Sequence, residues 1–154
     1  MEIRRSMSAP CGPDELFGWV EDLARYPQWM RLIHHVQPAP DVADRDVAVY
    51  PAWQVELRAH VGPFARSKVL RMVRTEHESP SRVVFERSET DGRRHSPWVL
   101  RATVDPNADG STLTMELRYG GSLWSGALLQ RVLDDAVRRG SMELLELVSV
   151  EPTR

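Results

Sequence analysis

The sequence has a single cysteine, Cys11, and a single lysine, Lys68, among its 154 residues. A lone cysteine cannot form a disulfide within the chain, and Cys11 has no companion at metal-ligand spacing, so a disulfide-stapled or cysteine-metal scaffold is excluded. None is needed, because a chain of this length buries roughly 70% of its unfolded surface on folding. We therefore expect one domain, 1–154, in a reducing compartment.

The chain also lacks a long hydrophobic run and an excess of charge of one sign. No apolar run approaches the roughly 20 residues that cross a bilayer, and the N-terminal MEIRR has no apolar signal core. The net charge of −2 provides no basic footprint for nucleic acid. We therefore predict a soluble, cytoplasmic protein with no integral membrane segment and no nucleic-acid partner.

Recognisable catalytic and metal-binding motifs are also missing. His34 and His35 are adjacent, so on a strand they point to opposite faces and cannot share a metal, and the other histidines, His60, His77 and His95, are scattered. No glycine-rich phosphate loop, nucleophile elbow or His-Glu-x-x-His pattern occurs. We expect no metal and no cofactor.

What the chain does have is hydrophobic periodicity of two kinds. Helical spacing predicts two short helices and one long helix, over 13–23, 26–32 and about 123–149. Alternation of apolar and polar residues predicts strands over 2–9, 33–38, 53–61, 65–76, 82–89, 97–105 and 111–120. The PAPDVADRD stretch, 38–46, reads as a loop.

This order of elements predicts an α+β architecture. Six or seven antiparallel strands with one apolar face need a cover, and only the C-terminal helix is long and apolar enough to provide it. A twisted sheet wrapped around one helix closes poorly at its ends, so a cavity can persist between them. Gly140 falls on the apolar side of that helix, where glycine costs about 1 kcal/mol relative to alanine. Close packing and room for a ligand both remain open as its reason.

Three segments resemble the START/Bet v 1-like superfamily, nearest to its bacterial polyketide cyclase/dehydrase and lipid-transport group. They are SMSAPCGPDELFGWVEDLARYPQWM at 6–30, the antiparallel block 53–120 with a Gly-Pro-Phe turn at 62–64, and the long closing helix. The resemblance implies a helix-grip fold with a deep apolar cavity for lipids, polyketides, quinones or other hydrophobic small molecules. It does not imply catalysis, since many members only bind or carry.

A cavity of this kind needs apolar walls and a few polar groups that orient the ligand. Inward positions of the predicted strands and of the C-terminal helix supply the candidate ligand-binding residues: Trp53, Val55, Leu57, Trp98, Leu100, Met115, Leu117, Tyr119, Leu133, Val137 and Gly140. Each would also serve as ordinary core. Trp53 and Trp98 are two of the five tryptophans among eleven aromatic residues.

Weak catalytic candidates are Arg71, Arg74 and Tyr119. Arg71 shares strand parity with Val69 and Val73, and Arg74 with Leu70 and Met72, so one arginine lies with an apolar set. In the aromatase/cyclase relatives an inward arginine and aromatic hydroxyls direct cyclisation and dehydration. The corresponding strand here, SKVLRMVRT at 67–75, departs from their tryptophan-rich pattern.

Three functions remain open from the sequence. The leading hypothesis is a protein, more a carrier than an enzyme, that binds a hydrophobic small molecule. The alternative is a cyclase, aromatase or dehydratase that uses Arg71 or Arg74 with Tyr119. A third is a protein-interaction module that uses the exposed Arg93–Arg94 and Arg138–Arg139 pairs. Whether the chain forms a homodimer is not decided by the sequence.

Overall fold

The computed structural model describes residues 2–39, 50–61, 63–120 and 126–149. In chain order the elements are β1 Glu2–Ala9, α1 Pro13–Val20, the 3₁₀ helix η1 Leu23–Gln28, β2 Ile33–Pro38, β3 Ala52–Val61, β4 Phe64–Glu78, β5 Arg82–Arg87, β6 Trp98–Asn107, β7 Gly110–Tyr119 and α2 Gly126–Ser149. Residues 40–46 of the expected loop, and the expected start of the long helix at about 123, lie outside the described residues.

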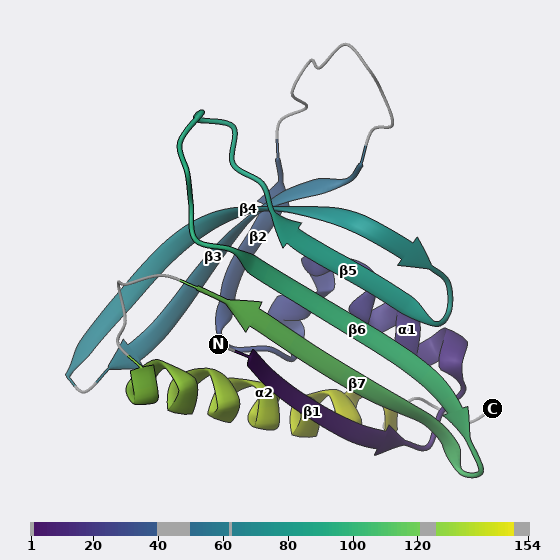
Figure 1. The fold of residues 1–154 in the computed structure, drawn as a ribbon. Coiled ribbons are helices and arrows are strands. Elements are labelled where there is room, and N and C mark those ends of the chain that lie inside the picture. Colours follow the sequence, from purple (N-terminus) through teal and green to yellow (C-terminus); the bar gives the residue numbers. More distant parts are fainter. Residues whose placement is uncertain (1, 40–49, 62, 121–125, 150–154) are drawn as a thin grey trace.

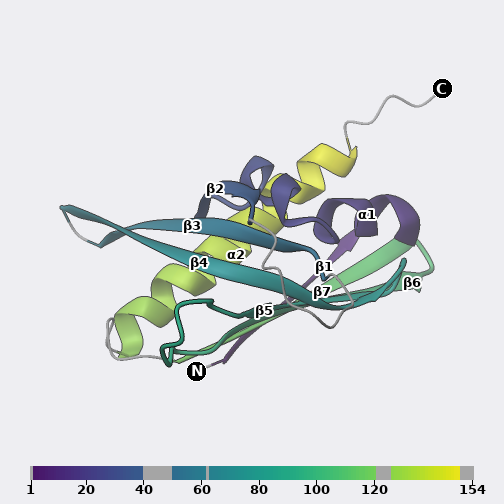
Figure 2. The same cartoon turned by 90° about the horizontal axis from the view of Figure 1, so that it is seen from above.

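In the described part of the chain, seven strands form one antiparallel sheet in the order β1-β7-β6-β5-β4-β3-β2. The first two strands of the chain are therefore the two edges of the sheet. The long helix α2 lies along one side of the curved sheet. Helices α1 and η1 lie on the same side, towards the C-terminal half of α2 (Figures 1 and 2). This arrangement confirms the predicted α+β helix-grip architecture.

Strict alternation places one face of the sheet against the helices. On β3, Trp53, Val55, Leu57 and Ala59 are all at most 8% exposed, while the residues between them are half-buried or exposed. Strand β7 alternates in the same way over its whole length. Because successive side chains of a strand point to opposite faces, this pattern fixes which face meets the helices.

The two short helices differ from their predicted bounds. The first ends at Val20 instead of residue 23, and the second occupies Leu23–Gln28 instead of 26–32. The cause is Asp22, whose side chain accepts a 2.9 Å hydrogen bond from the backbone N–H of Ala24. A side-chain oxygen in this position caps the start of a new helix, so the first helix stops before it.

Gly140 of α2 lies against the loop that follows η1. A Cβ atom at this position would sit 3.1 Å from the Met30 sulfur and 3.1 Å from the carbonyl oxygen of Trp29. Both contacts are tighter than ordinary van der Waals packing. The glycine therefore permits a close approach between α2 and this loop. Of the two reasons considered for Gly140, close packing and room for a ligand, these contacts favour close packing.

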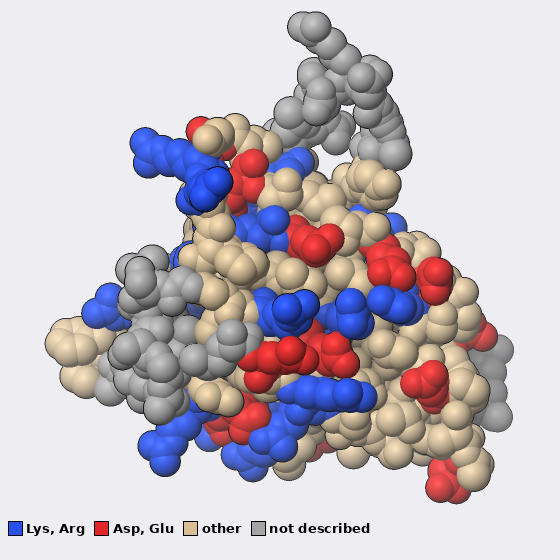
Figure 3. All heavy atoms as spheres, viewed as in Figure 1, with Lys and Arg blue, Asp and Glu red and all other residues tan. Residues whose placement is uncertain are grey.

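The outer face of the sheet carries charges of both signs. In Figure 3 blue and red side chains alternate across β1, β7 and β6. Glu116 on β7 lies 3.7 Å from Arg4 and 3.4 Å from Arg101, and Arg118 lies 3.9 Å from Glu2. Exposed pairs of this kind contribute little stability each, and on this face they leave no broad field of one sign.

Candidate functional site: an apolar cavity

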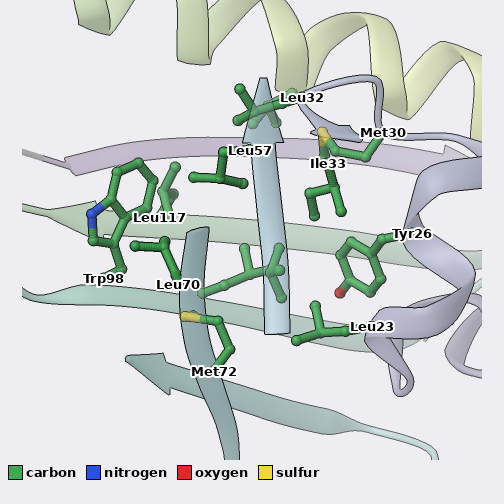
Figure 4. A pocket seen from close by; sticks show the side chains of 13 residues that line it. Leu23, Tyr26, Met30, Leu32, Ile33, Leu57, Leu70, Met72, Trp98 and Leu117 are labelled. Atoms are coloured by element: carbon green, nitrogen blue, oxygen red, sulfur yellow. The ribbon is translucent and has the colours of Figure 1, made fainter. Parts of the chain in front are cut away.

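A cavity of about 60 Å³ lies between the inner face of the sheet and the helices. Figure 4 shows side chains from both layers converging on it. Its thirteen lining residues come from η1, the loop after it, five strands and α2: Leu23, Tyr26, Met30, Leu32, Ile33, Val55, Leu57, Leu70, Met72, Trp98, Leu100, Leu117 and Val137.

The wall of the cavity offers almost nothing polar. Eleven of the thirteen side chains are aliphatic or methionine. The hydroxyl of Tyr26 donates a 2.8 Å hydrogen bond to the carbonyl of Val20, and burial raises the pKa of Tyr26 far above its usual range. In the described structure the buried indole N–H of Trp98 has no hydrogen-bond partner. The cavity thus suits an apolar group.

The size of the cavity sets a second condition. A cavity of about 150 Å³ is enough to hold benzene, and ligand pockets usually exceed about 300 Å³. The present 60 Å³ therefore admits a ligand only if side chains move. Met30 and Met72 border the cavity, and methionine has three rotatable bonds and adapts readily to irregular space. Displacement of these two side chains is the least costly way to enlarge the site.

The structure places the predicted ligand-binding residues in two groups. The first group lines the cavity and consists of Val55, Leu57, Trp98, Leu100, Leu117 and Val137. The second group does not line it. Trp53 packs edge-on against Phe85 with ring centres 5.7 Å apart, Tyr119 lies against Trp98 at 5.4 Å, and Met115 and Gly140 are buried elsewhere. The side chain of Leu133 lies outside the described part of the chain.

Sequence reasoning missed the other half of the wall. Leu70 and Met72 carried a usable signal, because they share the inward parity of β4. Leu23, Tyr26, Met30, Leu32 and Ile33 carried none. They come from a 3₁₀ helix, the loop after it and the first residue of β2, where hydrophobic residues follow neither the helical nor the strand period.

None of the weak catalytic candidates lines the cavity. Strand parity predicts that either Arg71 or Arg74 lies with the inward apolar residues of β4, and the structure shows that it is Arg74. Its guanidinium donates a 2.9 Å hydrogen bond to the carbonyl of Glu21. Arg71 donates a 3.0 Å hydrogen bond to the carbonyl of Ser88. Tyr119 is on β7, separated from β4 by two strands, and burial raises its pKa.

Among the described residues, no group of three or more histidine, cysteine, aspartate or glutamate side chains could hold a metal ion. In the same part of the chain, no helix combines the length and the apolarity that crossing a membrane requires.

An antiparallel sheet that wraps one long C-terminal helix, with an apolar cavity between them, defines a protein of the helix-grip class. The chain belongs to the polyketide cyclase / dehydrase and lipid transport family, whose model matches residues 1–148. No curated protein matches the sequence.

Solved structures with the same fold are similar to this chain at low sequence identity. A START superfamily protein from Mycobacterium smegmatis is 14% identical with a TM-score of 0.69, over 96% of this chain and 97% of that one. The AHSA1 protein from Silicibacter pomeroyi is 20% identical with a TM-score of 0.61, over 99% and 100%. The di-domain aromatase/cyclase StfQ of the steffimycin biosynthetic pathway is 11% identical with a TM-score of 0.67, over 97% of this chain and 51% of that one.

Proposed function

We propose that the protein binds or carries a hydrophobic small molecule, such as a lipid or a polyketide, in the cavity between the sheet and α2. The observation that carries this proposal is the wall itself, in which side chains from seven elements meet around a space with almost no polar group. A fold that only needed a core could close this space with larger side chains. The family description, which includes lipid transport, supports the same assignment.

The direct test is binding of a neutral apolar fluorophore, N-phenyl-1-naphthylamine. We expect saturable binding of one molecule per chain, with the blue shift of a dry environment, and displacement by dodecan-1-ol. A protein with a solid core would show neither signal, and that result would refute the proposal.

A cavity-filling substitution is the first prediction. Replacing Leu100 with phenylalanine adds volume on the cavity side of β6, so we expect fluorophore affinity to fall by roughly tenfold or more, because each 1.4 kcal/mol of lost binding energy is a factor of ten. Fluorescence titration measures the loss. Val99→Phe is the matched control, since its ring is added to the opposite face of the same strand. Equal affinity in the two variants would contradict binding in this cavity.

Two observations favour binding over the cyclase alternative. The guanidinium groups of Arg71 and Arg74 are engaged with backbone carbonyls outside the cavity wall. Oxyanion stabilisation requires donors aimed at the reacting oxygen, and neither arginine is aimed into the cavity. If the protein is a carrier, Arg71→Ala and Arg74→Ala leave ligand affinity unchanged.

The interaction-module alternative has less support. Arg138 and Arg139 of α2 both pair with Asp135, at 2.9 Å and 3.0 Å. One carboxylate thus offsets part of the charge of this arginine pair, which weakens the pair as a site for an acidic partner.

A further inference from the structure

A second hollow, an open groove of about 560 Å³, lies beside the cavity. It runs between the free end of β3, the loop before β2 and the N-terminal half of α2. Strand β3 extends past the start of β2, because Ile33 is paired with Leu57 and the residues after Leu57 have no β2 partner. The groove is lined by charged side chains around an apolar floor that includes Ala59 and Ala136.

The groove and the cavity meet at one side chain. Leu32 lines both of them, and in Figure 4 it lies at the end of the cavity that faces the α2 ribbon. On the cavity side its neighbours in the wall include Leu57 and Val137. Rotation of this one leucine would therefore open the cavity towards the groove.

The groove carries a positive excess. Arg31, Arg58 and Arg139 line it with one aspartate, Asp135, so three positive charges face one negative charge when the histidines there are neutral. Arg31 is 2.9 Å from Glu143, which lies beyond the lining. Arg139 shares Asp135 with Arg138, so this carboxylate is already matched by two guanidinium groups.

Arg58 is the cation that remains available. Its side chain is exposed, its Nε donates a 3.3 Å hydrogen bond to the Ser67 hydroxyl, and within the described residues it has no ion pair. Its backbone N–H donates to the carbonyl of Leu32 at 2.9 Å. This backbone hydrogen bond places Arg58 next to Leu32, the residue that lines both the groove and the cavity.

The chemistry of the two hollows is complementary. A charged head group inside the cavity would lose its hydration with no polar group of the wall to replace it, and burial of an unpaired charge is strongly unfavourable. The groove offers the opposite environment, since a guanidinium forms paired hydrogen bonds with carboxylate or phosphate oxygens.

We propose that the ligand is amphipathic, with an anionic head held by Arg58 in the groove and an aliphatic tail that passes Leu32 into the cavity. This inference rests on the proposed function and adds the class of ligand to it. The head is a carboxylate or a phosphate, because both present oxygens that match a guanidinium.

The test compares four ligands that share one twelve-carbon chain: dodecanoate, dodecyl phosphate, dodecan-1-ol and dodecylammonium. Each displaces N-phenyl-1-naphthylamine at low ionic strength and below its micelle-forming concentration. We expect at least one anionic ligand to bind roughly tenfold more tightly than the alcohol, the effect of one hydrogen bond to a charged group. The cation should bind no better than the alcohol. The ratio of carboxylate to phosphate affinity identifies the head group.

Arg58→Gln is expected to remove this preference and leave the affinity for dodecan-1-ol unchanged. The matched control is Arg66→Gln, which deletes the same charge from the adjacent strand outside the groove lining and should keep the preference. Equal affinity for all four heads, or a preference that survives Arg58→Gln, overturns the anionic-head proposal while the cavity proposal stands. Failure of every ligand to displace the fluorophore overturns both.

Discussion

Replacing Gly110 with alanine is expected to lower the free energy of unfolding by about 3 kcal/mol or more, which combines backbone strain with a steric clash. Gly110 has φ of +147°, a region that side chains rarely adopt. A Cβ atom there would also lie 2.3 Å from the carbonyl oxygen of Ala9 and 2.8 Å from the backbone nitrogen of Cys11. Both are backbone atoms, so relief requires the β1–α1 connection to move. Urea denaturation monitored by tryptophan fluorescence measures the loss.

Substitutions of two other glycines separate the contribution of backbone strain from that of the steric clash. Gly92 also has a positive φ, +73°, but a Cβ there would meet nothing within 4 Å, so Gly92→Ala should cost about 1 kcal/mol from backbone conformation alone. Gly12 has an ordinary φ of −69° and open space around it, so Gly12→Ala should cost only about 0.5 kcal/mol, the disadvantage of alanine at a helix N-cap. If Gly110→Ala were no more costly than Gly92→Ala, the clash with the β1–α1 connection would be excluded.

Disruption of the β1–α1 connection by Gly110→Ala would also affect the apolar cavity. The hydroxyl of Ser111, next to Gly110, donates a 2.7 Å hydrogen bond to the carbonyl of Cys11. Together these contacts fix where β1 ends and α1 begins. The chain then continues through α1 into η1 and the loop that supply Leu23, Tyr26, Met30 and Leu32 to the cavity.

The sheet could be predicted from the sequence because β3, β6 and β7 follow one simple rule. Val55, Leu57, Leu100 and Leu117 alternate with polar residues, and alternation alone places them on the covered face. The long helix was predictable for the same reason, since an apolar stripe at helical spacing needs a partner surface.

The remaining part of the wall could not be predicted because tertiary contacts position it. Met30 lies in the wall because Gly140, more than a hundred residues later, has no side chain to keep the loop away. The bounds of both short helices differ from the predicted ones because Asp22 caps the start of η1. No local pattern encodes contacts of this kind.

The groove has the same origin. Arg31, Arg58 and Arg139 come from three separate segments and form no motif. The sequence predicts Arg138 and Arg139 to be exposed, and in the structure they are exposed and both contact Asp135. Arg58 distinguishes the site because it has no ion pair among the described residues, and only the placement of the neighbouring segments reveals this.

Enlarging the cavity is the second prediction with a large effect. Leu70 is 1% exposed and lines the cavity, so Leu70→Ala is expected to cost about 2–5 kcal/mol through lost burial and a larger void. Val69→Ala is the matched control on the same strand, because Val69 is 57% exposed and should change stability by less than about 0.5 kcal/mol.

The same variant tests whether this void is the binding site. A ligand that binds only the folded state at about 100 times its Kd adds about 2.7 kcal/mol of stability. Because the enlarged cavity accepts an aliphatic chain without displacing Met30 or Met72, dodecan-1-ol should stabilise Leu70→Ala more than the unsubstituted protein. Leu113→Ala creates a comparable void outside the cavity wall, since Leu113 is fully buried but does not line the site. It should lose similar stability and gain no more from the alcohol than the unsubstituted protein does. Of the two substituted residues, only Leu70 lines the cavity that is proposed to hold the ligand's tail. If dodecan-1-ol stabilised both variants equally, the aliphatic tail would therefore lie outside this cavity.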